Sequence, residues 1–124
     1  MHRPPRHPVV HLELHTGNLA RACAFYTQLF GWRAEQLPAA GRRYLTLGLG
    51  ATIEGGVVEG DTERPRWLPY VEVADIGDAT ERAKLLGASV VLEPREGPAG
   101  WRSVLASSAG GEIALWQPKV ERLP

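Results

Sequence analysis

The sequence lacks the features that mark several classes of protein. It has 124 residues, one cysteine (Cys23), 14 basic and 14 acidic residues, and no long apolar run. A single cysteine cannot form an internal disulfide or a cysteine-based zinc site, and a membrane helix needs about 20 apolar residues. A neutral chain also lacks the basic excess that favours nucleic acid or anionic membranes. We therefore expect a cytoplasmic protein that binds neither nucleic acid nor membranes.

What the sequence does contain is a repeated pattern. Residues 11–38 align with residues 68–94, and Asn18 falls on Asp75. Such self-similarity indicates two copies of one structural unit. The predicted segments are an extended or disordered tail over 1–8, one domain over 9–118 made of modules 9–59 and 67–118, and a C-terminal tail over 119–124.

Each module is predicted to be a strand, a helix and three further strands, which makes the fold class α+β with two tandem βαβββ modules. Apolar and polar residues alternate over 9–15, which is typical of a strand with one buried face. Asn18 and Asp75 are expected to cap the helices, and Gly31 and Gly87 to end them. The later strands are expected at 33–37, 44–49, 52–58, 89–92, 102–106 and 112–117.

Apolar residues at helical spacing are expected to face the core of each module. They are Leu19, Ala22, Phe25, Tyr26, Leu29 and Phe30 in the first helix, and Ile76, Ala79, Ala83 and Leu86 in the second. A single module buries too little apolar surface to be stable by itself. We therefore expect the two sheets to curve around a shared cavity, lined by their helix-free faces, and the functional site to lie there.

Polar and aromatic residues occupy the predicted helix-free faces. The same steps back from each cap reach His11, Glu13 and His15 in the first module, and Leu68, Tyr70 and Glu72 in the second. In the last strands the repeat sets Glu54 against Ala114, with Glu112 and Trp116 nearby. A solvated sheet face is the alternative interpretation of the first set. Leu68 and Tyr70 are poorly suited to open water, which favours a cavity.

A series of short motifs resembles one superfamily over nearly the whole chain. The motifs are VHLEL, AFYTQLFGW, IEGGVVE, PYVEVADIGDA and EIALWQP. Together they are similar to the vicinal oxygen chelate superfamily, which includes lactoylglutathione lyase, the bleomycin and fosfomycin resistance proteins and the extradiol dioxygenases. The resemblance is greatest to its small two-module bacterial members related to lactoylglutathione lyase.

This resemblance implies a divalent metal, such as Ni, Zn, Mn or Fe, held by one ligand from the first and one from the last strand of each module. The corresponding positions here are His11, Glu54, Leu68 and Ala114. Leu68 and Ala114 cannot bind a metal, so the implied site is incomplete. The resemblance also implies a homodimer.

Two functions remain open at this point. One is a lyase or isomerase in which a metal on His11 and Glu54 assists proton transfer by Glu13 or Glu72. The other is a non-catalytic protein that sequesters a drug or metabolite, as the bleomycin resistance proteins do. The expected ligand contacts are His15, Tyr70, Trp101, Glu112 and Trp116, with the loop 95–100 at the cavity mouth. Trp101 and Trp116 fit core positions equally well.

Overall fold

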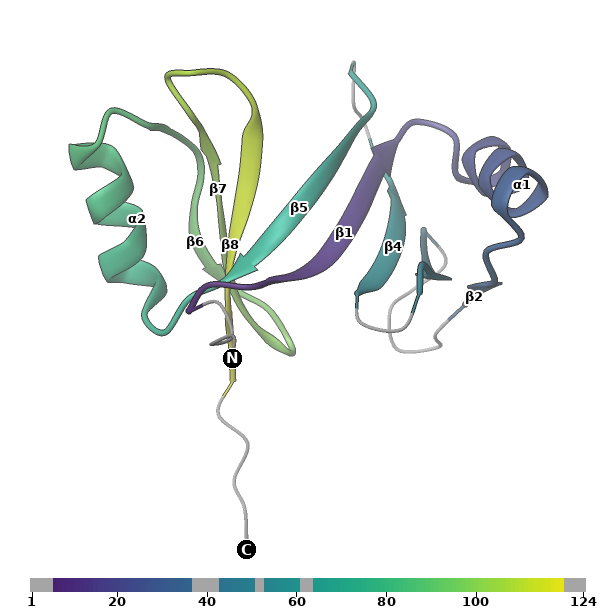
Figure 1. Ribbon diagram of the computed structural model, residues 1–124, viewed down its shortest axis with the longest axis horizontal. Coiled ribbons are helices and arrows are strands. Elements are labelled where there is room, and N and C mark those ends of the chain that lie inside the picture. The colour runs from purple at the N-terminus through teal and green to yellow at the C-terminus, as the bar shows by residue number, and fades with distance from the viewer. Residues whose placement is uncertain (1–5, 37–42, 51–52, 61–63, 120–124) are drawn as a thin grey trace, which may run out of the picture. The chain divides into compact units, whose positions relative to one another are not determined.

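The computed structural model describes residues 6–36, 43–50, 53–60 and 64–119. The chain divides into two compact units, one of residues 10–68 and one of residues 1–9 with 69–124. Both contain strands and a helix, which confirms the α+β class (Figure 1). In the part of the chain described, no helix is long and apolar enough to cross a membrane.

The unit of residues 10–68 follows the predicted order of elements. Its elements are β1 (Val9–Thr16), α1 (Leu19–Phe30), β2 (Ala34–Glu35), β3 (Tyr44–Gly48) and β4 (Glu54–Glu59). Their order in the sheet is β2–β3–β4–β1. β1 pairs with β4 in parallel, whereas the β2–β3 and β3–β4 pairs are antiparallel.

The other unit repeats this arrangement. Its elements are β5 (Arg66–Glu72), α2 (Ile76–Leu85), β6 (Ser89–Glu96), β7 (Gly100–Ala106) and β8 (Glu112–Pro118). Their order in the sheet is β5–β8–β7–β6, with β5 and β8 parallel and the other pairs antiparallel. α2 lies along one side of these strands (Figure 1).

The predicted caps hold both helices in place. The Asn18 side chain accepts a hydrogen bond from the backbone N–H of Arg21 at 3.0 Å, and Asp75 accepts one from Asp78 at 2.9 Å. Each bond satisfies one of the free N–H groups of a first helical turn. Gly31 ends α1 with φ 71°, a conformation that favours glycine.

Each helix covers a small apolar core. Leu14, Cys23, Leu47 and Val57 form the core under α1, and Val73, Ile76, Leu105 and Leu115 form the core under α2. Burial raises the pKa of the Cys23 thiol. This placement makes Cys23 a packing residue rather than a reactive thiol.

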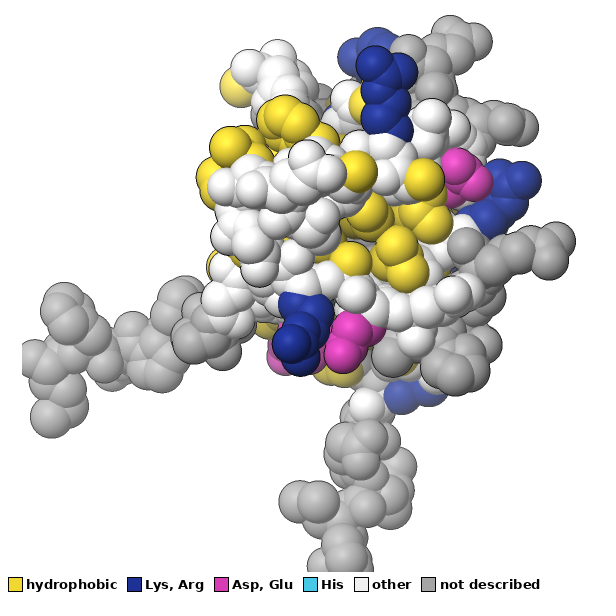
Figure 2. Space-filling view, turned by 90° about the vertical axis from the view of Figure 1, so that its right-hand side faces the viewer, with side chains coloured by type: hydrophobic (Ala, Val, Ile, Leu, Met, Phe, Trp, Pro, Cys, Tyr) yellow, Lys and Arg dark blue, Asp and Glu magenta, His cyan; other side chains and the backbone are white. Residues whose placement is uncertain are grey.

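Some apolar helix residues predicted to be buried are exposed. Phe25, Leu29 and Phe30 are 57%, 57% and 54% exposed, and Leu86 is 73% exposed. The buried side of α1 contains Cys23, with partly buried residues 19, 22 and 26 beside it, and a helix on a sheet buries only one such stripe. Leu86 follows the last turn of α2 as its C-cap. Hydrophobic side chains accordingly gather on the surface of the side that carries α1 (Figure 2).

Several strands differ from prediction in their bounds. β2 contains only Ala34 and Glu35, and the end of the predicted strand at residue 37 lies outside the described residues. β6 continues to Glu96, and β7 begins at Gly100. The predicted loop over 95–100 is therefore reduced to residues 97–99.

Candidate functional site

β1 presents three titratable side chains on one face of its sheet. Leu14 packs into the core under α1, so His11, Glu13 and His15 face the opposite side, because successive strand residues alternate. The Glu13 carboxylate lies between the two rings, 3.3 Å from His11 Nε2 and 3.1 Å from His15 Nε2. Glu13 is only 9% exposed. The predicted proton-transfer residue is thus a buried carboxylate held between two imidazoles.

The His15 ring places its Nε2 against the Glu13 carboxylate. Its Nε2 is buried and has no hydrogen-bond partner, since its approach to Glu13 has the distance but not the angle of a hydrogen bond. An unsatisfied buried polar atom costs about 1–3 kcal/mol.

Tyr44 on β3 reaches the same face and was missed by the sequence analysis. Its hydroxyl lies above Gly56 of β4, where any Cβ atom would collide with it. Burial, and then the charges of Glu13 and Glu54, raise the pKa of Tyr44 to about 12. The phenol is therefore a neutral proton donor close to two acids. The combination of an aromatic residue and a glycine on neighbouring strands was the signal in the sequence.

Glu54 begins β4 beside His11, its Cα partner across the parallel β1–β4 pair. Glu54 is exposed, whereas Glu13 is buried. The structure therefore brings the predicted metal ligands His11 and Glu54 together with Glu13 and His15.

The other unit carries a separate group of predicted residues. Tyr70 is 6% exposed, and its ring lies 6.3 Å from that of Trp116 between centroids. Glu72 is the Cα partner of Trp116 across β5 and β8. Arg102 of β7, which the sequence analysis also missed, donates from Nη1 to the Tyr70 hydroxyl at 3.0 Å. Glu112 begins β8 and has Ala106 as its partner on β7.

Trp101 lies on the wrong face for the ligand contact predicted for it. It packs against the core under α2, with Lys119 Nζ 5.8 Å from its ring centroid. In the strand registers, the counterpart of Tyr44 on β7 is Arg102, which lies one residue after Trp101. A shift of one residue moves a side chain to the other face of a sheet.

The registers also correct the alignment of the last strands. Glu13 is the partner of Gly56 across β1 and β4, and Tyr70 is the partner of Ala114 across β5 and β8. Glu13 and Tyr70 each lie five residues before a helix cap. The structural counterpart of Ala114 is therefore Gly56, and not Glu54 as the sequence alignment had it.

Two residues earlier on each strand, Glu54 corresponds to Glu112. The fourth position of the implied metal set is then Glu112, while Leu68 still offers no donor atom. Across residues 6–36, 43–50, 53–60 and 64–119, no three His, Cys, Asp or Glu side chains form a group that could hold a metal ion. A catalytic divalent ion generally needs three protein ligands. His11 and Glu54 lie in one unit and Glu112 in the other, so neither unit alone supplies three of these donors, and we assign the chemistry of the site to the chain's own acids, bases and hydroxyls.

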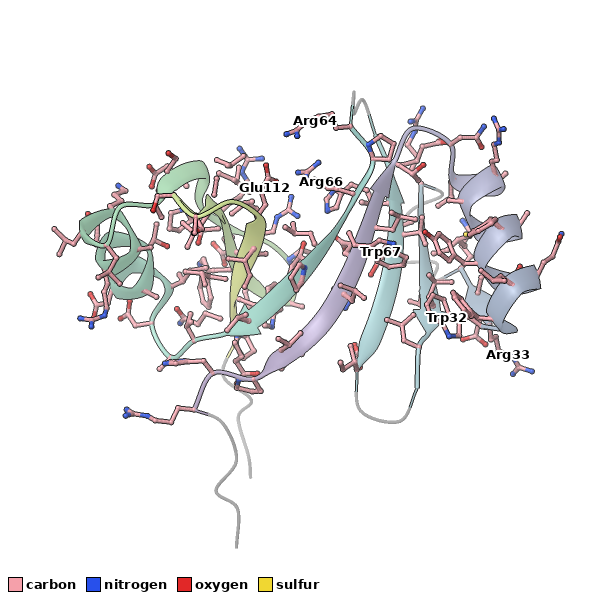
Figure 3. All side chains as sticks on the ribbon, turned by 45° about the horizontal axis from the view of Figure 1, so that its top comes forward. Trp32, Arg33, Arg64, Arg66, Trp67 and Glu112 are labelled. Atoms are coloured by element: carbon pink, nitrogen blue, oxygen red, sulfur yellow. The ribbon has the colours of Figure 1, made fainter. Side chains whose placement is uncertain are left out.

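A hollow in the unit of residues 10–68 lies on the opposite side, beside α1. It is mainly apolar and is lined by Leu14, Thr16, Asn18, Arg21, Ala22, Phe25, Tyr26 and Pro65. Next to it, the rings of Trp32 and Trp67 pack on Tyr26 at 5.9 Å and 5.2 Å between centroids (Figure 3). Trp32 and Trp67 therefore support α1.

Two βαβββ units, each with polar and aromatic side chains on its helix-free face, define a member of the vicinal oxygen chelate superfamily. Residues 9–116 match the family model described as a glyoxalase-like domain, and the chain belongs to this family. Members of the superfamily commonly bind small molecules, use a divalent metal and form dimers.

Comparisons with individual proteins agree with this assignment. The chain is 28% identical over 116 residues to the putative glyoxylase CFP32 of Mycobacterium bovis, covering 86% of this chain and 44% of the relative. The chain thus spans less than half the length of this curated relative. Its fold resembles a hypothetical protein from Bacillus halodurans (TM-score 0.68, 16% identity, 97% and 100% coverage) and a methylmalonyl-CoA epimerase from Mycobacterium tuberculosis (0.65, 18%, 97% and 94%).

Proposed function

We propose that this protein is a small-molecule lyase or isomerase in which Glu13 transfers a proton to and from a carbon atom of the substrate. The observation that carries the proposal is the position of the Glu13 carboxylate, buried and within 3.3 Å of two imidazole nitrogens. A positioned carboxylate is a common general base. The name of the epimerase that shares this fold agrees with the isomerase class.

The groups around Glu13 suit such a reaction. His11 and His15 hold the Glu13 carboxylate from both sides. The carboxylate therefore loses less conformational freedom when the substrate binds. The Tyr44 hydroxyl remains protonated because its pKa is raised to about 12, and it can donate to an oxygen that gains charge. Glu72 remains the alternative base, although it is more exposed than Glu13.

Solvent-deuterium incorporation tests this role. Hydroxy-ketones and thiol adducts of 2-oxoaldehydes would be incubated with the protein in D2O and followed by proton NMR. We expect exchange at the carbon beside the carbonyl, and a loss of at least about 100-fold in Glu13→Gln, a typical contribution of a general base. Glu81→Gln, on the exposed surface of α2, is the matched control. Unchanged exchange in Glu13→Gln would refute the proposal.

A second function, non-catalytic sequestration of a drug or metabolite, is favoured by a different observation. The Tyr70 and Trp116 rings lie 6.3 Å apart on one sheet face and could contact a flat ligand. Thermal-shift screening separates the two functions. Stabilisation by aromatic drugs with no exchange activity supports sequestration, whereas stabilisation by hydroxy-ketones together with exchange supports catalysis.

We also propose a homodimer in the cytoplasm. The curated relative is more than twice as long as the segment it shares with this chain, so it has room for a second such domain. The one cysteine, Cys23, is buried and unpaired, which suits a reducing compartment. One chain has a mass of 13.5 kDa. Light scattering at micromolar concentration should give twice this mass. The mass of a single chain would refute the dimer.

A further inference from the structure

Arg102 lies on β7, on the helix-free face of its sheet. Its register partners on this face are Arg95 of β6 and Trp116 of β8. Its guanidinium donates to the Tyr70 hydroxyl at 3.0 Å. Because β8 lies between β7 and β5, this bond passes over β8, where the partner of Tyr70 is Ala114. The methyl side chain of Ala114 leaves room for the guanidinium to cross.

The positive charge of Arg102 is not balanced within the described residues. Over 6–36, 43–50, 53–60 and 64–119, Arg102 forms no salt bridge, although its side chain is half-buried. Arg95 beside it adds a second positive charge. Glu72 lies one strand beyond Trp116 and does not pair with Arg102. A partly buried charge without a counter-ion is costly, so the arrangement favours an anion.

We propose that Arg102 binds the carboxylate of a small organic acid, with the Trp116 ring beside it contacting the apolar part of the same molecule. The bond to Tyr70 uses one of the five N–H donors of a guanidinium. The remaining donors match the two oxygens of a carboxylate, which arginine binds as a fork. Tyr70 holds the guanidinium in position above Ala114.

This inference goes beyond the proton transfer proposed for Glu13 and does not depend on it. Arg102 would select a ligand by charge whether or not that ligand reacts.

A matched pair of probes tests the inference. Phenylacetate and phenylacetamide have the same ring and differ in charge, so their dissociation constants can be compared by titration calorimetry or NMR. We expect the wild-type protein to bind the acid at least about ten-fold more tightly than the amide, as for one charge-assisted hydrogen-bonded pair. Arg102→Gln should lower the affinity for the acid to that for the amide. Tyr70→Phe should reduce the acid-to-amide ratio to a smaller extent.

Arg82→Gln, which removes a charge from the exposed surface of α2, should leave the ratio unchanged. Circular dichroism would show whether Arg102→Gln folds. If it does not, Arg102→Lys keeps the charge but not the forked guanidinium, and it should give an intermediate acid-to-amide ratio. A wild-type protein that binds the acid no better than the amide overturns the inference, as does an unchanged ratio in the Arg102 variants. Glu13→Gln should retain the ratio while losing proton exchange, so the two proposals can fail separately.

Discussion

Tyr44 determines much of the chemical character of the face that carries Glu13. Burial and the charges of Glu13 and Glu54 raise its pKa to about 12, whereas an ordinary tyrosine ionises near pH 10. In an alkaline titration of tyrosinate absorbance, we expect Tyr44 to ionise near pH 12. Tyr44→Phe should remove this phase. A phase near pH 12 that persists in Tyr44→Phe would contradict the assignment.

The same shift makes stability depend on pH. Between pH 10 and pH 12 the unfolded chain has lost the Tyr44 proton while the folded chain retains it. The contribution of this proton to the free energy of unfolding is therefore fully present below about pH 10 and is lost as the pH rises towards 12. Urea midpoints measured over this range should fall less steeply in Tyr44→Phe than in the wild-type protein.

The sequence predicted some residues of the site correctly and missed others. The alternation around Glu13 placed His11 and His15 on its face, because strand periodicity is a local property. Tyr44 and Arg102 were missed because each side chain reaches over a neighbouring strand. The Tyr44 hydroxyl lies above Gly56 of β4, and Arg102 reaches the Tyr70 hydroxyl across β8. Only strand register can show which small residue lies beneath a long side chain.

At the scale of elements, Gly100 at the start of β7 is a point of close strand approach. A Cβ atom there would collide with the backbone carbonyl of Gln117 and crowd the Trp116 ring. We expect Gly100→Ala to lower the free energy of unfolding by about 1–3 kcal/mol, the usual cost of overpacking. Gly60 has nothing within 4 Å of such an atom, so Gly60→Ala should change stability by less than about 0.5 kcal/mol. Equal effects in urea unfolding would contradict this account.

α2 is joined to its sheet by a buried pair of hydroxyls. Thr80 and Ser103 are 1% and 0% exposed, and their oxygens lie 2.9 Å apart. The Thr80 hydroxyl donates to the carbonyl of Ile76, so Ser103 donates to Thr80. Thr80→Val would leave the Ser103 hydroxyl unsatisfied and should cost about 1–3 kcal/mol in urea unfolding.

The control for this pair is the double variant Thr80→Val with Ser103→Ala. Removing both hydroxyls leaves no unsatisfied group, so the double variant should be more stable than Thr80→Val alone. A double variant less stable than the single one would show that the hydroxyls do not act as a pair.

Elements were predicted more reliably than their registers. Asn18 and Asp75 cap α1 and α2 as expected, because capping depends on residues close in sequence. The placement of Trp101 failed by one residue and that of Ala114 by two. Register depends on pairing between strands distant in sequence, where a glycine or a β-bulge, as in β6, changes the count.

At the scale of the whole molecule, the two units are linked by continuous strands. β5 passes from one unit to the other between Leu68 and Pro69, and β1 does so between Val9 and Val10. The backbone N–H of Glu72 donates to the carbonyl of Pro8 at 2.9 Å, so the N-terminal segment belongs with the second unit. The unit of residues 10–68 contains nearly all of module 9–59 and the start of β5, whereas the other unit combines residues 1–9 with residues 69–124.

The shared strands β1 and β5 predict that both units unfold together, since neither unit can lose its structure without disrupting a strand that the other also uses. Trp32 and Trp67 report on one unit, and Trp101 and Trp116 on the other. The four indole N–H resonances followed by NMR in urea should therefore disappear with one common midpoint. Gly100→Ala should lower that midpoint for all four together, although it lies in one unit. Two separate midpoints, or a shift confined to Trp101 and Trp116, would mean that each unit folds independently.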